Sequence, residues 1–368
     1  MKAGVAAGMT GELRVIAGDL LPARMNLSIT EALCRGLQRG EAPETLRFQL
    51  FPPSAIVGRH QILVKEVNLA WAAAHGVETA RRMTGGGAIV MGPGILGWEL
   101  VVSSRRAAGG LDAFTASICT AVAEGLGSLG VRARFRPRND IEVDGRKVSG
   151  TGGYVDGAAL VFQGTVLVSL NVGLLAGALN LPAHKLGKRG LSALADRVTD
   201  LATVLGTPPP PARVRSALAP AMALALGLAP VEGRLSAREL AEAERIHDAE
   251  IGRDAFVDGS DRAFPPGGRV VTHEAALPGG VVEIVLKLRD GADDTIDQAL
   301  IAGDVFATPP RLLGDLEARL RHARLRDVAD LARDHLARSQ GRLAGIGAED
   351  FVAALRDAAS LAAGGAAR

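Results

Sequence analysis

The chain has few aromatic residues, few cysteines and almost no net charge, and each shortage narrows the possible functions. Phe, Trp and Tyr make up 3% of the residues, and the formal net charge is +2. Proteins that bind nucleic acid usually combine a strongly basic surface with aromatic side chains for base stacking, so we expect no nucleic-acid partner. The two cysteines, Cys34 and Cys119, lie far apart and without CxxC spacing. This argues against a disulfide framework and a structural zinc site, and it fits a reducing compartment.

The sequence also lacks an apolar run of membrane-spanning length. The longest run, ALAPAMALALGLAPV at residues 217–231, contains two prolines and is shorter than the about 20 residues that a transmembrane helix needs. We interpret it as part of a buried helix. At the N-terminus, Glu12 and Arg14 interrupt the apolar residues, so we expect no signal peptide, no membrane partner and a cytoplasmic location.

Helix and strand patterns follow one another irregularly, which predicts an α+β fold. Apolar residues at helical spacing predict helices over residues 22–40, 66–76 and 112–130. Alternating or continuous apolar runs predict strands over residues 45–51, 54–60, 88–94, 97–103 and 140–170. Asp144-Gly145 and Asp156-Gly157 are typical of hairpin turns. Because the strands do not alternate one-to-one with helices, we expect a mixed or largely antiparallel sheet flanked by helices.

A segment rich in Gly, Pro and Asp, residues 258–269, divides the chain. It is followed by two strand-like runs, residues 269–277 and 281–291, and then by helical patterns to the end. We therefore predict a larger domain of residues 1–258 and a small αβ domain of residues 259–368.

The stretch RRMTGGGAIVMGPG, residues 81–94, concentrates glycine in one loop. Ordering a glycine within regular structure costs about 0.5–1 kcal/mol more than ordering an alanine, so the run needs a reason. Glycines let backbone N–H groups approach an anion, and Arg82 can add charge-assisted hydrogen bonds of about 1.5–3 kcal/mol each. A tight loop without a ligand is equally consistent with Gly85–Gly87 alone. The spacing matches neither a P-loop nor a Rossmann fingerprint.

A second candidate site lies in RPRNDIEVDGRKVSGTGG, residues 136–153. Lys147 falls between a hairpin turn and a further glycine-bearing segment, where an ammonium can bind a carboxylate or phosphate. Asn139 and Asp140 are expected at the head of the same hairpin, where a carboxylate can reach Mg²⁺. Alone, Lys147 is better interpreted as a solvated hairpin lysine, but the glycine run shifts the balance toward a binding site.

Three blocks in this order resemble the lipoate–protein ligase family, within the biotin/lipoate ligase superfamily: residues 81–102, 138–168 and 184–201. PARMNLSITEAL, AIVGRHQILVKEVNLAWAAAHGV and residues 279–320 are also similar to that family, so the resemblance covers nearly the whole chain. It implies a class II synthetase-like sheet in a catalytic domain of residues 1–258, followed by an accessory domain of residues 259–368.

The resemblance implies a two-step reaction. Such enzymes use ATP to activate lipoic acid as lipoyl-adenylate and then transfer the lipoyl group to a lysine of a lipoyl carrier domain. Lys147 matches the family's essential lysine, which contacts the acyl carboxyl group and the α-phosphate. Asp140 is the implied Mg²⁺ ligand. The residues implied to bind ATP and the acid are Arg82, Gly85, Gly86, Gly87, Ala88, Ile89, Val90, Met91, Asn139, Asp140, Gly150 and Thr165.

The chain departs from the family pattern where many relatives have histidines. Met91-Gly92 and Phe162-Gln163-Gly164-Thr165 stand at those places, which makes the expected pocket more apolar. The MGPG sequence leans toward octanoyltransferases. One alternative function is therefore octanoyl or lipoyl transfer without ATP, which needs a cysteine near Lys147.

Two further functions fit the residues less well. A catalytically silent carrier-binding protein is disfavoured by the intact Lys147, and biotin ligation by the absence of a GRGRxGR-type loop.

Cys34 and Cys119 are expected to be buried structural thiols. The basic segment at His184 and Lys185 is equally consistent with a flap near the adenylate and with a solvated loop.

Overall fold

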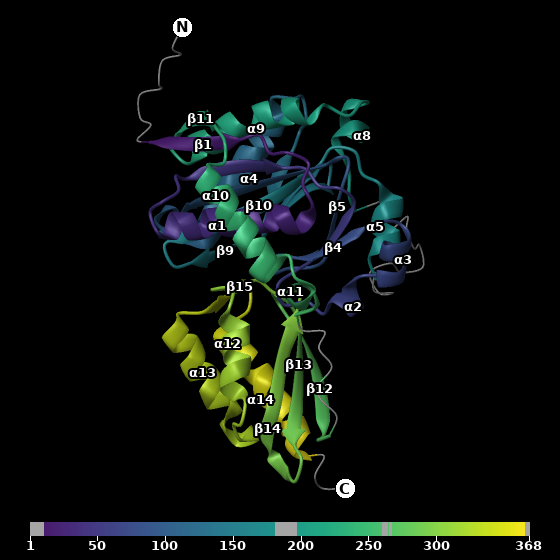
Figure 1. The fold of residues 1–368 in the computed structure, drawn as a ribbon, viewed down its shortest axis with the longest axis vertical. Coiled ribbons are helices and arrows are strands. Elements are labelled where there is room, and N and C mark those ends of the chain that lie inside the picture. Colours follow the sequence, from purple (N-terminus) through teal and green to yellow (C-terminus); the bar gives the residue numbers. More distant parts are fainter. Residues whose placement is uncertain (1–10, 181–196, 260–263, 265–266, 365–368) are drawn as a thin grey trace. The chain divides into compact units, whose positions relative to one another are not determined.

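The computed structural model describes residues 11–180, 197–259, 264 and 267–364, which fall into two structural units (Figure 1). The first unit comprises Met1–Ile56, Val67–Ala80 and Ile89–Arg253, and the second comprises Val57–Glu66, Arg81–Ala88 and Asp254–Arg368. The second unit thus includes two short segments from the N-terminal half of the chain. The predicted domain boundary after residue 258 stays a prediction.

A mixed sheet forms the centre of the first unit, and its strand order is β11-β1-β2-β6-β10-β9-β8-β7. β1 runs parallel to β11 and β2, and the strands from β2 to β7 pair antiparallel. This arrangement confirms the predicted mixed or antiparallel sheet. The strands are β1 (Glu12–Ile16), β2 (Thr45–Gln49), β6 (Ile95–Ser103), β7 (Arg134–Arg136), β8 (Asp140–Val143), β9 (Arg146–Asp156), β10 (Ala159–Leu167) and β11 (Ala229–Gly233).

Helices cover both faces of this sheet. In α4 (Leu111–Gly127), Phe114, Ile118 and Val122 recur at helical spacing and pack in one buried cluster with Trp98. α9 (Pro211–Ala225) contributes to the same cluster. The opposite face is polar: Glu99 accepts hydrogen bonds from Arg47 of β2 and from Thr30 of α1 (Ala23–Gln38), at 2.7 and 2.6 Å.

The remaining elements of the first unit are short. A second sheet has the order β4-β3-β5. Its strands and the other helices are β3 (Ser54–Val57), β4 (Glu78–Arg81), β5 (Ile89–Met91), α3 (Leu69–Ala74), α5 (Val172–Ala178), α8 (Leu201–Leu205) and α10 (Ala237–Ile246). α10 begins with a capping box between Ser236 and Glu239.

The second unit contains a sheet of order β12-β13-β14, and helices pack against it. On β13, Val282, Ile284 and Leu286 alternate with less buried residues and join one hydrophobic cluster with the helices. The elements are α2 (Leu63–Glu66), α11 (Asp254–Asp258), β12 (Val270–Leu277), β13 (Gly280–Arg289), β14 (Ala292–Gly303), β15 (Ala307–Thr308), α12 (Leu312–Leu320), α13 (Val328–Ser339), β16 (Arg342–Leu343) and α14 (Ala348–Gly364).

The expectation of two strands followed only by helices in this region was wrong. β14 is a third long strand, which pairs antiparallel with β13. Its sequence, ADDTIDQALIAG, is rich in residues that disfavour strands when considered singly. Pairing with β13 and burial of Ile296 and Ile301 override that local preference.

Arg81 joins three chain segments within the second unit. Its guanidinium is buried and donates hydrogen bonds to the carbonyl oxygens of Gly58 and Gln61, at 3.0 and 2.5 Å. It also donates to the carbonyl of Val257, at 2.9 Å. These bonds explain why residues 57–66 and the start of the glycine loop belong with the C-terminal part of the chain.

Most other predicted elements of the first unit are confirmed. α1, α3 and α4 lie where the periodicity predicts helices. Residues 217–231 form a helix only up to Ala225, and the end of the run forms the edge strand β11. The basic segment at His184 and Lys185 lies outside the described residues.

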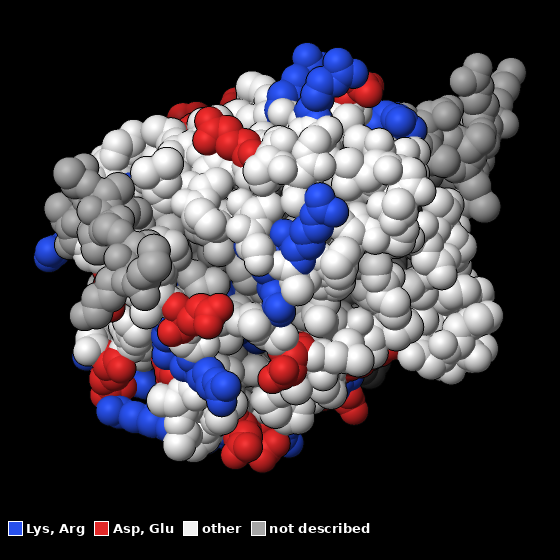
Figure 2. All heavy atoms as spheres, turned by 90° about the horizontal axis from the view of Figure 1, so that it is seen from above, with Lys and Arg blue, Asp and Glu red and all other residues white. Residues whose placement is uncertain are grey.

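Charges on the surface are mixed. Figure 2 shows one face of the molecule, on which basic and acidic side chains are interspersed among wide uncharged areas. On this face, the described basic side chains form no continuous surface of the kind that binds nucleic acid. Among the described residues, no helix is long and apolar enough to cross a membrane.

Candidate functional site

The hairpin of β8 and β9 positions Lys147. Its turn, Asp144-Gly145, has φ angles of 50° and 78°, as the sequence predicts for a tight hairpin. Ile141 pairs with Ser149, whereas Glu142 pairs with Lys147, so β9 bulges by one residue at Val148. The bulge changes the direction of β9 beside Lys147.

Lys147 forms an ion pair within this hairpin. Its Nζ lies 2.6 Å from Oδ1 of Asp140, and its side chain is 39% exposed, so a ligand can still reach the ammonium. To make this contact, Lys147 passes over Gly150. A Cβ added to Gly150 would lie 2.6 Å from both Cε and Nζ of Lys147. Glycine at this position therefore makes room for the lysine itself.

The backbone of Lys147 is held by residues 197–199, and the sequence analysis did not predict this contact. Its N–H donates to the carbonyl of Arg197 at 2.9 Å, and its carbonyl accepts from the N–H of Thr199 at 2.8 Å. Within the described residues, the buried hydroxyls of Ser149 and Thr199 have no hydrogen-bond partner. No local pattern in the sequence indicates this pairing, because the two segments are far apart in the chain.

Asn139 stabilises the end of the hairpin. Its carbonyl accepts from the backbone N–H and the hydroxyl of Thr151, at 2.9 and 3.0 Å, and its Nδ2 donates to the carbonyl of Thr151 at 2.6 Å. Thr165, on β10, is half-buried. Strand register places Thr165, Gly150 and Asp140 on the polar face of the sheet, opposite the hydrophobic cluster.

The glycine loop belongs to the second unit, where Arg82 binds the loop's own carbonyls. The guanidinium of Arg82 donates to the carbonyl oxygens of Gly85 and Gly87, at 2.7 and 2.8 Å. Burial lowers the pKa of Arg82 to about 10, with a smaller contribution from Arg81, so the side chain stays charged at neutral pH. Arg82 thus shapes the loop in addition to any contact with a ligand.

Two of the three glycines are required by neighbouring protein atoms. A Cβ added to Gly85 would lie 2.0 Å from the carbonyl oxygen of Val305, and one added to Gly86 would lie 2.5 Å from the ring of Phe306. The N–H of Gly86 donates to the carbonyl of Val305 at 3.2 Å. By contrast, no heavy atom of the described residues lies within 4 Å of a Cβ added to Gly87.

The strand after the loop is largely buried. Val90 and Met91 are 7% and 2% exposed, and β5 pairs with β3 through Ile89–Met91. Ala88 belongs to the second unit and Ile89 to the first. The lining of a nucleotide by residues 88–91 therefore stays a prediction.

The structure brings Lys147, Asp140, Asn139 and Gly150 together in one hairpin. Arg82 and Gly85–Gly87 lie together in the second unit. The predicted binding roles of both groups stay predictions.

At the second place where many relatives have histidines, Phe162 and Gln163 are accounted for by their contacts. Phe162 is 2% exposed, and its ring lies 5.5 Å from Phe114 and 5.9 Å from Trp98. Gln163 donates to Glu99 at 3.0 Å on the polar face. An imidazole at position 162 would place a polar ring among these aromatic side chains.

Both cysteines are buried, at 1% and 0% exposure, as expected for structural thiols. Burial raises the pKa of Cys34 to about 12 and that of Cys119 to about 11. Cys119 lies beneath the hairpin, with Sγ 3.5 Å from the hydroxyl of Thr151. Burial and the raised pKa values both disfavour the thiolate form of these cysteines at neutral pH.

Among the described residues, no three His, Cys, Asp or Glu side chains are grouped so that they could hold a metal ion. Asp140 offers a single carboxylate, which fits an ion delivered with a nucleotide better than a permanent metal site.

Comparisons with known proteins match this chain to lipoyl ligases and to an octanoyltransferase. The family model described as the lipoyl protein ligase A/B catalytic domain matches residues 22–223. The chain is 30% identical over 256 residues to octanoyltransferase LipM of Symbiobacterium thermophilum, an alignment covering 63% of this chain and 93% of that protein. It is 28% identical over 184 residues to lipoate-protein ligase LplJ of Bacillus subtilis, covering 50% of this chain and 54% of that one. The chain thus spans about half the length of that ligase.

The fold also matches a solved structure. The crystal structure of lipoate-protein ligase A bound with ATP superposes with a TM-score of 0.60 and 25% identity, covering 68% of this chain and 99% of that chain.

Proposed function

Because the chain belongs to the family of lipoyl protein ligase A/B catalytic domains, we propose that it is an ATP-dependent lipoate–protein ligase. It activates lipoic acid as lipoyl-AMP and transfers the lipoyl group to one lysine of a lipoyl carrier domain, in the cytoplasm. Relatives that support this proposal are a lipoate-protein ligase and a ligase solved with ATP bound. One relative is an octanoyltransferase, so octanoyl or lipoyl transfer without ATP is the second candidate.

The burial of both cysteines is the observation that favours ligation over transfer. A transferase that forms an acyl-thioester on itself needs an accessible thiolate. The sequence contains only Cys34 and Cys119, and both are buried with raised pKa values. Acyl-adenylate formation needs no enzyme nucleophile, because the acid itself attacks ATP.

The two steps need positioned charge. In the first, a carboxylate oxygen of lipoic acid bonds to the α-phosphorus of ATP, and the bond to pyrophosphate breaks. In the second, the acceptor amine bonds to the acyl carbon, AMP leaves, and the amine loses a proton. The ammonium of Lys147 can bind the negative charge at the junction of acid and phosphate, and Asp140 holds that ammonium in place.

Mg²⁺ is part of the proposal as a companion of ATP. In nucleotide sites this ion is commonly bound by one or two carboxylates together with substrate phosphates, where it neutralises phosphate charge. Asp140 is the carboxylate that we propose to hold it. The contribution of Arg82 and Gly85–Gly87 to binding of the acyl-adenylate also belongs to the proposal.

Pyrophosphate exchange tests the proposed reaction. The wild-type protein with ATP, Mg²⁺ and lipoic acid should incorporate labelled pyrophosphate into ATP without any carrier domain. A Cys34→Ala/Cys119→Ala variant should retain this exchange. If exchange is absent and octanoyl groups instead move from an acyl carrier to a lipoyl domain without ATP, transfer is the correct function. Loss of that transfer in the Cys119→Ala variant would identify the thiol.

A further inference from the structure

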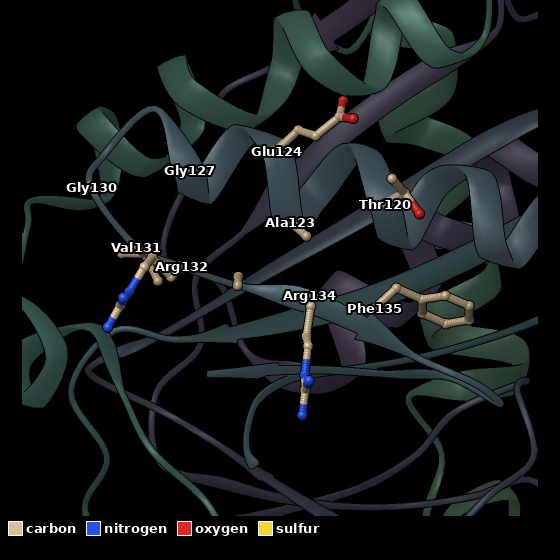
Figure 3. A pocket seen from close by; sticks show the side chains of 10 residues that line it. Thr120, Ala123, Glu124, Gly127, Gly130, Val131, Arg132, Arg134 and Phe135 are labelled. Carbon is tan, nitrogen blue, oxygen red and sulfur yellow. The ribbon is translucent and has the colours of Figure 1, made fainter. Parts of the chain in front are cut away.

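β7 carries arginine at alternate positions. In the sequence VRARFRPR, residues 131–138, arginine occupies positions 132, 134, 136 and 138. Arg134 and Arg136 lie at alternate positions of β7 and therefore point to one side, whereas Arg132 lies just before the strand. Val131, Ala133 and Phe135 pack against the hydrophobic cluster. Figure 3 shows the side chains of Arg132 and Arg134 extending from the chain on the side away from α4. We call Arg132, Arg134 and Arg136 the arginine row.

The arginine row has more positive charge than its surroundings neutralise. Arg136 is paired with Glu142 at 2.8 Å. Arg132 and Arg134 are exposed, and within the described part of the chain neither forms a salt bridge. Glu142 is also the register partner of Arg134, so one carboxylate faces two guanidinium groups. Two cations therefore remain available to an incoming partner.

Strand register puts Arg134 and Arg136 of the row on the same face of the sheet as Lys147. Arg134 pairs with Glu142, which pairs with Lys147, and Arg136 pairs with Asp140, which pairs with Gly150. Directly paired residues point to the same face, and neighbouring strands lie about 4.8 Å apart. The row therefore lies about 10 Å from the backbone of Lys147, two strands away.

The position of β7 leaves space for a partner. It ends the strand order of the large sheet, so no further strand of the described residues covers its outer edge. An open hollow of about 680 Å³ lies on the α4 side of residues 130–135, whereas the side chains of the row extend away from α4 (Figure 3). Charged residues on an edge strand also discourage aggregation, but that purpose does not require charges of one sign beside Lys147.

We propose that the arginine row is the docking surface for the protein substrate, and that it binds an acidic face of the domain that presents the acceptor lysine. This inference rests on the proposed function, because it assigns a partner to the same site. Charge complementarity steers association and sets specificity, and arginine is enriched at protein interfaces. An acidic surface held by Arg132 and Arg134 would bring a neighbouring lysine of the carrier to the face that holds Lys147.

Charge reversal in the full-length protein tests the proposal. The variant is Arg132→Glu/Arg134→Glu, and the matched control is Arg105→Glu/Arg213→Glu, which reverses two exposed arginines of the same unit outside the row. Pyrophosphate exchange without carrier should be unchanged in both. In the transfer step, KM for an apo lipoyl domain should rise at least about tenfold in the row variant, with kcat little changed. The control should stay within about twofold of wild type.

Direct binding separates this inference from the proposed reaction. Affinity of the apo lipoyl domain, measured by fluorescence anisotropy without ATP, should fall with rising salt in wild type and show a weaker salt dependence in the row variant. Equal affinity and equal salt dependence in the two proteins would overturn the docking surface even if ligation is confirmed. Loss of pyrophosphate exchange in the row variant would overturn it too, because the arginines would then serve the nucleotide. If no exchange occurs in wild type but binding responds as expected, docking stands and the proposed reaction fails.

Discussion

Glycines in the hairpin and in the glycine loop leave room for different neighbours. In the hairpin, Gly150 makes room for Lys147 of the same strand. In the loop, Gly85 and Gly86 make room for Val305 and Phe306 of the C-terminal part of the chain, while Gly87 stays open. A glycine run in a sequence therefore predicts close approach, but it does not reveal whether the neighbour is a ligand, a side chain of the same element or a distant segment.

The largest effect is expected in the hairpin. Lys147→Ala should reduce pyrophosphate exchange roughly 10²–10³-fold, since it removes a preorganised cation from developing charge. Asp140→Asn keeps the ammonium but removes its partner, so it should cause a smaller loss. The pyrophosphate exchange rates of both variants are measured at saturating ATP. Normal exchange by Lys147→Ala would show that the ion pair is structural.

Gly85→Ala should destabilise the second unit by about 3 kcal/mol, because the new Cβ meets a backbone carbonyl that has little freedom to move. Gly87→Ala is the matched control and should change stability by less than about 0.5 kcal/mol. Urea unfolding of the two variants measures the difference. If Gly87→Ala weakens lipoic acid binding at unchanged stability, the ligand side of the loop is at Gly87. Equal destabilisation by Gly85→Ala and Gly87→Ala would contradict the conclusion that neighbouring atoms require glycine at position 85 but not at position 87.

Two separate effects are expected to destabilise a Gly86→Ala variant, and a double-mutant cycle can separate them. Its φ of +84° costs an alanine about 1–2 kcal/mol, and the ring of Phe306 adds a clash. Phe306→Ala should relieve only the clash, so the double variant should be at least about 1 kcal/mol more stable than the sum of the single changes indicates. Additive changes in the free energy of unfolding would mean that Phe306 moves away without cost.

The smallest expected effect is the contribution of His60 to the pH dependence of the free energy of unfolding. Burial lowers the pKa of His60 to about 3, helped by Arg59 and Arg81. Its folded pKa lies below the unfolded value of 6.5, so this contribution to stability is complete above pH 6.5 and declines as pH falls toward 3. Between pH 8 and pH 6, the free energy of unfolding of the wild type should fall by about 0.8 kcal/mol more than that of the His60→Gln variant. Parallel pH profiles of the two proteins would show that His60 is not buried as a neutral group.

Local signals in the sequence predicted the parts of the molecule that depend on local structure. The Asp144-Gly145 turn, α1 and α4 follow from turn chemistry and apolar spacing. The choice of Lys147 as a candidate rested on the glycine run and on the family resemblance, because its place beside the turn alone indicated a solvated lysine. β14 could not be predicted in this way, because its residues become a strand only through pairing with β13. The bonds from Arg197 and Thr199 to Lys147 and the packing of Val305 against Gly85 join distant segments, and no short-range pattern encodes them.

The buried Arg81 has a consequence for anyone who wishes to shorten this protein. Three of its acceptors, the carbonyls of Phe256, Val257 and Asp258, follow the last residue of the first unit. A truncation that ends at Arg253 would leave a buried guanidinium without these acceptors and remove Val305 and Phe306 from the glycines beside it. A minimal version of the enzyme therefore needs a compensating substitution at Arg81 before its C-terminal third can be deleted.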